Sequence, residues 1–371
     1  MEKAESLIRE ILDHANVKVN GSRPWDITVN DPRFYQRIMR DGILGLGESY
    51  MDEWWDCDDL EQFIFHVLNA DLEHVISPLK LLLPVIKAKL VNNQTKNRAA
   101  KNVRSHYDRG NVLFQNMLDR RLTYSCGYWK DVETLDQAQE AKLNLICKKL
   151  NLRSGSHVLD IGCGWGSFLK FAAEEYGATG VGITLSREQV KLGKDLCSGL
   201  PIEIRLQDYR DLDSVYDVVV SIGMFEHIGS ANYRRFMETV DRVLDDDGLF
   251  LLHTIGSNDI KHNRDLWTER YIFPGSHLPT IEQIAKSACG LFVMEDWHNF
   301  GEDYGTTLQA WLGNFNANWE RTLSKHYDRR FYRMWSYMLQ IYAGSFRARR
   351  NQLWQIVYSK SGVPGGYCSV R

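Results

Sequence analysis

The pattern of apolar and polar positions changes near residue 155. From there, short apolar runs alternate with amphipathic stretches, which is typical of strands and helices in a parallel sheet covered on both faces. The expected strands are HVLDIG, ATGVGITL, IEIRLQDYR, YDVVVSIG, GLFLLHTIG, FVMEDWHNF and LWQIVYSK, and the expected helices between them are SFLKFAAEEYG, REQVKLGKDLC and YRRFMETVDRVL. The aromatic-rich segment 305–350 is expected to form helices inserted before the last strand.

The first 90 residues follow a different pattern. The opening segment has acids and apolar positions at helical spacing, and DCDDLEQFIFHVLNA begins with acids and continues with one apolar face. We therefore expect a small, helix-rich N-terminal domain over residues 1–90. The polar segment 91–104 is the expected linker, and residues 105–371 form the expected α/β domain.

Composition narrows the class of protein. With 371 residues, 44% hydrophobic and 25% charged, the sequence is typical of a globular protein, and its net charge of −3 gives no overall attraction to nucleic acid. Seven dispersed cysteines without a CxxC pair argue against disulfides and a structural zinc, so we expect a reducing cytoplasm and no metal. No signal peptide and no apolar run of about 18 residues is recognised, so any action on a membrane is expected from its surface.

One local basic stretch stands out between Lys80 and Arg109, where Asp108 is the only acid. It has two interpretations. It is either a solvated linker or helix face, or a patch that meets anionic lipid headgroups, where each basic residue contributes up to about 1 kcal/mol.

The segment VLDIGCGWG joins a strand to a helix through three glycines, with Asp160 just before them. Such glycines let the backbone approach a ligand and let the helix pack on the strand. The NAD fingerprint is GxGxxG and has an acid about 20 residues further on. Here the glycine spacing is GxGxG, and the second strand ends in GITLS, which contains no acid. The pattern fits the acid-first glycine loop of S-adenosylmethionine (SAM) methyltransferases better. The alternative is that the three glycines serve only the packing of the helix on the strand.

Several further motifs occur in order along the chain: LGLGESYMDEWW, YSCGYW, MFEHIG, LLHTIG, MEDWHNFGEDYGTTLQAW and AGSFRARRNQLWQ. They resemble those of the bacterial cyclopropane-fatty-acyl-phospholipid synthases, over essentially the whole chain. The mycobacterial mycolic-acid cyclopropane synthases share the catalytic motifs but lack the N-terminal region. The resemblance implies a class I SAM-dependent methyltransferase fold, Rossmann-like, with a mostly parallel seven-stranded sheet and a smaller helix-rich N-terminal domain.

The resemblance also implies a reaction and a site. The family adds a methylene group from SAM across a cis double bond of a phospholipid acyl chain, through a carbocation, and a bound bicarbonate is thought to take the last proton. The implied anion cage comprises the side chains of Glu226, His253 and Tyr304 and the main chain at Cys126 and Ile255. The implied cofactor residues are Tyr124, Ser125, Asp160, Gly162, Cys163, Gly164, Trp165, Gly166, Thr184, Leu185, Gln189, Gln207, Asp208 and Tyr209.

Simpler interpretations stand beside these assignments. His227 is expected to face away from Glu226 if both end a strand, and His253 in an apolar strand could be a core histidine. Cys126 is not expected to be a nucleophile, because no carbonyl is attacked. Tyr304 is expected in a glycine-flanked loop. Many family members carry a cysteine where this chain has Tyr342, which weakens any mechanism based on that cysteine.

The expected partners are phospholipids with unsaturated acyl chains, the inner face of the membrane as a peripheral contact, and a second copy in a homodimer. Two other functions stay open. One is methyl transfer that gives a methyl-branched lipid or methylates a soluble amine. The other is a non-catalytic module that binds SAM or lipid.

Overall fold

The computed structural model describes residues 2–70, 72, 110–258 and 265–371. They form two compact units, neither continuous in sequence. The helical unit lies within Met1–Asn92, Lys261–Pro274 and Leu308–Asn351, and the sheet unit within Asn93–Ile260, Gly275–Thr307 and Gln352–Arg371. The expected linker at 91–104 and the basic stretch 80–109 fall outside the described residues.

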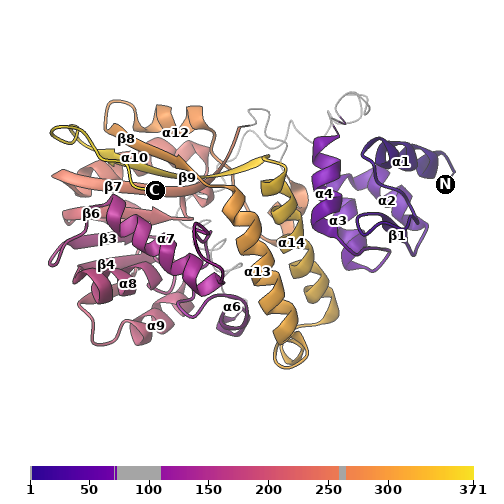
Figure 1. Cartoon of the computed structure of the whole chain (residues 1–371), viewed down its shortest axis with the longest axis horizontal. Coiled ribbons are helices and arrows are strands. Elements are labelled where there is room, and N and C mark those ends of the chain that lie inside the picture. The colour runs from indigo at the N-terminus through magenta and orange to yellow at the C-terminus, as the bar shows by residue number, and fades with distance from the viewer. Residues whose placement is uncertain (1, 71, 73–109, 259–264) are drawn as a thin grey trace. The chain divides into compact units, whose positions relative to one another are not determined.

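The sheet unit is built on seven strands in the order β5-β4-β3-β6-β7-β9-β8 (Figure 1). Their bounds are β3 His157–Ile161, β4 Thr179–Thr184, β5 Ile202–Leu206, β6 Tyr216–Ile222, β7 Leu244–Ser257, β8 Val293–Asn299 and β9 Asn351–Ser359. The strands from β3 to β7 pair in parallel, and β8 pairs antiparallel with β9. The predicted mostly parallel seven-stranded sheet is therefore confirmed.

The strand order reverses at β3, which pairs with β4 on one side and β6 on the other. In open α/β sheets, ligands bind outside the carboxyl ends of the strands at this point. The glycine-rich loop follows β3 there, and Glu226 follows β6. The topology therefore brings the two main motifs of the sequence to the same edge of the sheet.

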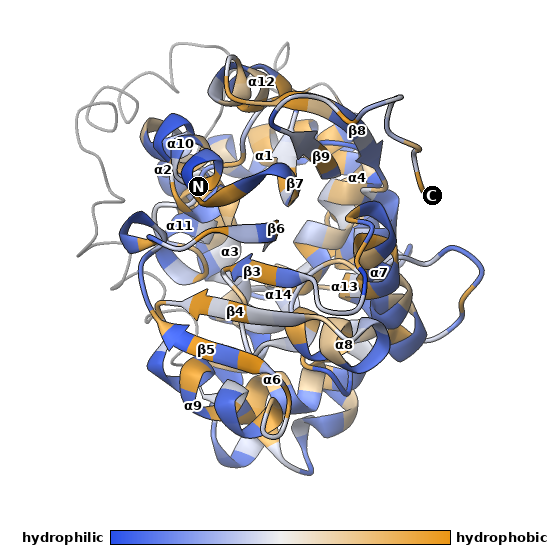
Figure 2. Cartoon of the chain, turned by 90° about the vertical axis from the view of Figure 1, so that its left-hand side faces the viewer, coloured by the Kyte–Doolittle hydropathy of each residue, from blue (hydrophilic) through white to orange (hydrophobic). Residues whose placement is uncertain are grey.

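Helices cover both faces of the sheet. The helices of this unit are α6 Asn111–Met117, α7 Leu135–Lys149, α8 Ser167–Tyr176, α9 Arg187–Leu196, α10 Tyr233–Val243, α12 Ile281–Ala288 and the start of α13 Glu302–Trp319. Alternate residues of β6 point to opposite faces: Val219 packs in the core under α10, and its neighbours Val218 and Val220 pack under α7 and α8. Figure 2 shows α7 and α8 on one side of these strands and α10 on the other.

Two strand boundaries differ from the predicted ones by four residues. Strand β5 ends at Leu206 instead of continuing through 210, because the Asp208 carboxylate accepts a hydrogen bond from the Arg210 amide and starts a 3₁₀ turn at Tyr209–Asp211. Strand β7 begins at Leu244, earlier than the predicted start of GLFLLHTIG. Both differences lie where local side-chain bonds or sheet pairing override the apolar pattern.

The helical unit combines elements from distant parts of the chain. It contains α1 Glu2–His14, β1 Ile27–Val29, α2 Arg33–Asp41, α3 Ile43–Met51, β2 Trp55–Cys57, α4 Leu60–Asn69, α11 Leu266–Tyr271, the later part of α13, and α14 Arg329–Arg347. Strands β1 and β2 form an antiparallel pair. Trp267 of α11 is fully buried against Gly47 of α3, and its indole NH points to the Met51 sulfur. The N-terminal elements therefore share one core with helices that come much later in the sequence.

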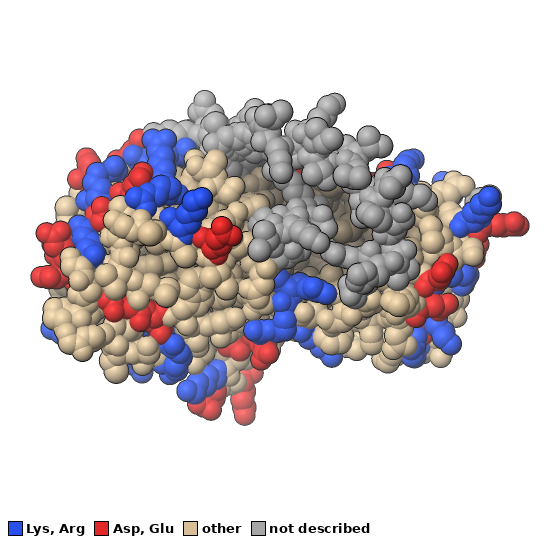
Figure 3. Space-filling view, turned by 90° about the horizontal axis from the view of Figure 1, so that it is seen from above, with Lys and Arg blue, Asp and Glu red and all other residues tan. Residues whose placement is uncertain are grey.

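The described surface carries charges of both signs. On the face shown in Figure 3, lysine and arginine side chains are interspersed with aspartate and glutamate. None of the helices in the described part of the chain is both long and apolar enough to cross a membrane.

Candidate active site

The loop after β3 needs its glycines for different reasons. Gly162, Gly164 and Gly166 all have positive φ angles of 90°, 57° and 84°. A Cβ on Gly162 would lie 2.8 Å from the Met224 side chain, whereas one on Gly164 would meet no atom within 4 Å. Gly164 therefore faces open space, and its bare backbone leaves room for a ligand to approach.

Asp160 lies at the carboxyl end of β3 and is 2% exposed. Its Oδ1 atom has no hydrogen-bond partner among the described residues. Burial raises the pKa of this carboxyl to about 7, and the charge of Lys142 opposes the shift. A buried acceptor without a donor is costly, so a ligand that brings a cationic donor would fit here.

Ser125, between Tyr124 and Cys126, is held against α7 by two side chains. The Lys142 ammonium donates to Ser125 Oγ at 2.9 Å, and the Gln139 amide donates to the Ser125 carbonyl at 2.7 Å. Both α7 residues are fully buried. The Tyr124 ring packs edge-on against Phe114 of α6, with ring centroids 5.1 Å apart.

The remaining predicted cofactor residues follow β3, β4 and β5. Cys163 and Trp165 are buried in the glycine-rich loop. Thr184 ends β4 and donates to Gln189 Oε1 of α9 at 2.6 Å. Leu185 follows Thr184 directly in the sequence. Gln207, Asp208 and Tyr209 follow β5; Asp208 pairs with Arg210 at 2.8 Å, and Tyr209 packs edge-on against Phe236. All of them lie at the carboxyl ends of three adjacent parallel strands.

Glu226 is 3% exposed and lies in a 3₁₀ turn, Phe225–His227, after β6. Its carboxyl accepts hydrogen bonds from Thr254 Oγ1 at 2.9 Å and from the Ile255 amide at 3.4 Å, both on β7. Burial raises the pKa of Glu226 to about 7, because these donors only partly compensate the lost hydration. Since β6 ends at Ile222, the expected strand-end geometry of Glu226 and His227 is wrong.

His253 is 1% exposed in β7, two residues before Ile255. The Gln355 amide lies 3.2 Å from His253 Nδ1, and when it donates there the neutral ring carries its proton on Nε2. Nε2 itself has no hydrogen-bond partner among the described residues. Burial and nearby lysine charges lower the pKa of His253 well below its usual value, so the ring is neutral at pH 7.

Tyr304 lies in the first turn of α13, so the expected loop position is wrong. Its helix is bonded to the segment after Cys126. Thr307 Oγ1 accepts hydrogen bonds from the Gly127 amide at 3.0 Å and the Trp129 indole at 2.9 Å, and Asp303 accepts from the Trp129 amide at 2.8 Å. These bonds fix the turn that carries Tyr304 to the segment that carries the Cys126 main chain.

The Cys126 thiol is fully buried, and burial raises its pKa well above the usual value. A thiol held in this form is a poor nucleophile, in line with the sequence-based interpretation.

Tyr342, where many family members have a cysteine, lies in α14 of the helical unit. Its hydroxyl is 2.9 Å from Thr268 Oγ1, and its ring stacks on Phe273. Tyr342 therefore has a packing role.

Direct contacts join Glu226 to Ile255, and α13 to the Cys126 segment, while His253 shares β7 with Ile255. Sequence reasoning missed the polar residues that support these groups. They are the buried Gln139, Lys142, Thr254, Thr307 and Gln355 and the half-buried Asp303. Thr254, Asp303, Thr307 and Gln355 lie within the motifs quoted above, which could have pointed to them. No quoted motif contains Gln139 or Lys142.

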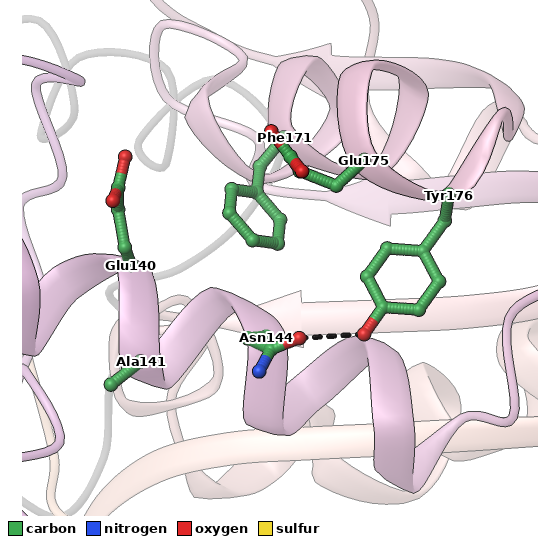
Figure 4. Close-up of a pocket in the computed structure, with 6 residues that line it drawn as sticks. All are labelled: Glu140, Ala141, Asn144, Phe171, Glu175 and Tyr176. Carbon is green, nitrogen blue, oxygen red and sulfur yellow. Dashed lines mark hydrogen bonds between the residues drawn. The ribbon is translucent and has the colours of Figure 1, made fainter.

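A separate surface groove of about 460 Å³ lies between α7 and α8 (Figure 4). Its lining residues are Glu140, Ala141, Asn144, Phe171, Glu175 and Tyr176, and Tyr176 donates to the Asn144 side chain at 2.6 Å. The predicted site residues do not line it, so it is distinct from the sheet edge described above.

Comparison with known proteins identifies the family. Residues 94–356 match the family model described as mycolic acid cyclopropane synthetase. The cyclopropane-fatty-acyl-phospholipid synthase of Escherichia coli K12 is 50% identical over 361 residues, 97% of this chain and 94% of that protein. The tuberculostearic acid methyltransferase of Mycobacterium tuberculosis is 30% identical over 353 residues, 89% of this chain and 82% of that protein.

A solved structure agrees with these relatives. The mycolic acid cyclopropane synthase CmaA1, crystallised with S-adenosylhomocysteine (SAH) and CTAB, superposes with a TM-score of 0.66 at 31% identity, over 70% of this chain and 98% of that one. The glycine-rich loop, the strand order and these relatives all indicate a SAM-dependent methyltransferase. The chain therefore belongs to the cyclopropane synthase family of SAM-dependent methyltransferases.

Proposed function

We propose that this enzyme is a cyclopropane-fatty-acyl-phospholipid synthase. It adds a methylene group from SAM to cis double bonds of phospholipid acyl chains, which yields S-adenosylhomocysteine and a proton. The proposal is supported by 50% identity, over nearly the whole chain, to a relative with this name. The observation within the site that carries it is the buried His253 Nε2, which has no hydrogen-bond partner among the described residues, at the same sheet edge as the buried Glu226 carboxyl.

These two groups fit a small bound oxyanion. With Gln355 donating to Nδ1, the His253 Nε2 proton is available to an acceptor. With a pKa of about 7, Glu226 retains a proton in a large fraction of molecules near pH 7, so it need not repel an anion. We propose bicarbonate as the anion, held by Glu226, His253, Tyr304 and the main chain at Cys126 and Ile255, where it would supply a proton acceptor shielded from water.

The SAM site is proposed along the carboxyl ends of β3, β4 and β5. When bound, SAM supplies an electrophilic methyl group. Asp160 Oδ1, which no described residue hydrogen-bonds, suits its amino group, and the open space beside Gly164 admits its amino-acid end. Tyr124, Ser125 and the loop through Gly166 would complete that end. Thr184, Leu185 and Gln189 would contact the ribose, and Gln207, Asp208 and Tyr209 the adenine.

The test is an assay with unsaturated phospholipid vesicles and isotopically labelled SAM. The expected product is an acyl chain heavier by one CH₂ group, and NMR is expected to show cyclopropane protons. A labelled product without these protons would contradict the proposal. SAH binding without turnover on any vesicle would favour a non-catalytic module.

A second candidate is transfer of a methyl group to the alkene without ring closure. It is favoured by the relative named as a tuberculostearic acid methyltransferase, at 30% identity over most of both chains. The same NMR spectrum separates the two outcomes, because only ring closure gives cyclopropane protons.

We also propose that the enzyme works at the cytoplasmic face of the membrane as a homodimer. Contact through the N-terminal domain and the basic stretch 80–109 would be weak for one chain. Two linked contacts would strengthen it by raising the effective concentration of the second.

A further inference from the structure

Lys142 is a fully buried lysine that the proposed reaction does not use. It lies on α7, and its ammonium donates to Ser125 Oγ at 2.9 Å. One turn earlier, Gln139 donates to the Ser125 carbonyl at 2.7 Å. Positions three apart lie on the same helix face, so α7 holds both the side chain and the main chain of this one serine.

The chemistry of an ammonium group fixes the direction of the hydrogen bond. A charged lysine has three donors and no acceptor, so Ser125 Oγ must accept from it. The hydroxyl proton of Ser125 is then free to be donated to another group. The Ser125 hydroxyl can therefore donate to an acceptor that lies on its other side.

Two buried carboxyl groups near Lys142 favour its charged ammonium form. Burial lowers the pKa of Lys142 to about 8, and the charge of Asp119 and of the ionised fraction of Asp160 opposes this shift, so the ammonium form predominates at pH 7. Asp119 is itself fixed by the Thr123 and Arg121 amides at 2.7 and 2.9 Å. Asp160 keeps Oδ1 without a partner in the described part of the chain.

We propose that Lys142 is a positioning residue of the methyl-donor site: it holds the Ser125 hydroxyl as a donor to the carboxylate of the SAM amino-acid end. Asp160 provides the matching acceptor for the ammonium of the same zwitterion. This inference rests on the proposed placement of SAM at Ser125 and Asp160. It adds the residue that decides which way the serine hydroxyl points.

This inference is tested by measuring how the full-length protein binds two nucleosides related to SAM. S-adenosylhomocysteine has the amino-acid end, whereas 5′-methylthioadenosine lacks it but keeps the nucleoside. We expect Lys142→Met to weaken SAH binding about tenfold or more in calorimetry, the usual effect of losing a charge-assisted hydrogen bond. Binding of 5′-methylthioadenosine is expected to change less than about twofold. Lys142→Gln, which also removes the charge, is measured in parallel and should give the same selective loss.

Lys149 provides the matched control. It lies on the same helix and its side chain is equally buried, but its ammonium contacts Asp296 at 3.4 Å and His298 at 3.1 Å. Lys149→Met is expected to leave the ratio of the two affinities unchanged. Equal weakening of both ligands by Lys142→Met and Lys142→Gln would indicate general damage and overturn the inference, as would unchanged SAH binding.

Ser125→Ala separates this inference from the proposed site. We expect the alanine variant to weaken SAH selectively and Lys142→Met to add little in that background, since it acts through the serine. If Ser125→Ala leaves SAH binding intact, the proposed placement of SAM fails. If the alanine variant weakens SAH binding but Lys142→Met does not, only the role of Lys142 fails.

Discussion

Burial leaves Glu226 and His253 largely uncharged, as the proposed binding of an anion requires. Loss of hydration raises the pKa of the Glu226 carboxyl to about 7 and keeps the His253 imidazole uncharged. Neither residue brings a full charge to the site at neutral pH, and both can present a proton. The arrangement is therefore better suited to holding a small oxyanion than to acting as a charged acid–base pair.

This assignment predicts the effect of Glu226→Gln on catalysis. The amide cannot exchange a proton with a bound anion, so we expect turnover on unsaturated vesicles to fall at least about tenfold. SAH affinity should change less than about twofold, because Glu226 bonds to β7 and not to the glycine-rich loop. An equal loss of SAH binding, measured by calorimetry, would instead make Glu226 a cofactor residue.

The same variant has a predicted effect on stability. Because the folded-state pKa of Glu226 is raised from 4.5 to about 7, the folded protein loses stability as pH rises from about 4.5 to 7, and the full cost remains above pH 7. Glu226→Gln removes an ionisation cost of up to about 3 kcal/mol. We expect its Tm to exceed that of the parent at pH 8 by more than at pH 5. A gap that narrows with rising pH would contradict the raised pKa.

At the residue scale, the sequence led to the prediction of Glu226 and His253 as site residues but not to the side chains that support the predicted site. Glu226 and His253 stand in recognisable motifs. No sequence-based prediction covered Gln139 or Lys142, and both are fully buried. Their burial depends on the segment around Ser125 packing against α7, which no local pattern in the sequence records.

At the scale of elements, Thr307 is the main connection between α13 and the segment after Cys126. Thr307→Val removes the acceptor for two donors, the buried Gly127 amide and the half-buried Trp129 indole. We expect a loss of about 2 kcal/mol or more in the free energy of unfolding. Turnover should fall as well, because Tyr304 lies one turn away on the same helix.

Thr307→Ser is the matched control, since it keeps the hydroxyl and loses only a methyl group. Denaturant unfolding and the vesicle assay are expected to place it near the parent protein. If the valine variant equals the serine variant in both measurements, these hydrogen bonds do not couple α13 to the site.

The elements themselves could be predicted from periodicity where one face or both faces are apolar. All seven predicted strands of the sheet are present, and the larger boundary errors lie where a side-chain bond intervenes, as at Asp208, or where sheet pairing extends the strand, as at Leu244. Helix α7 was not predicted: its buried Gln139, Lys142 and Lys149 interrupt the apolar stripe. The buried polar residues of α7 thus obscure the periodic apolar pattern by which a helix is recognised in a sequence.

At the scale of the whole molecule, the helical unit joins α3 and α4 to helices that follow β7 in sequence. Tyr342 belongs to this packing through its contact with Thr268. We expect Tyr342→Phe to cost about 1 kcal/mol of stability, the usual value of one hydrogen bond, and to leave turnover within about twofold. A loss of turnover without loss of Tm would instead assign Tyr342 to the reaction.

The charge of the basic stretch gives a prediction for membrane contact, although 80–109 lies outside the described residues. If Lys96, Arg98 and Lys101 meet anionic headgroups, each contributes up to about 1 kcal/mol at low salt. Replacing all three with glutamine should then weaken sedimentation with anionic vesicles by about tenfold or more. High salt should remove most of the difference, because it screens exposed charges. Turnover on detergent-dispersed phospholipid is the control and should stay unchanged. Vesicle binding that is equal for both proteins at low salt would leave the stretch as a solvated linker.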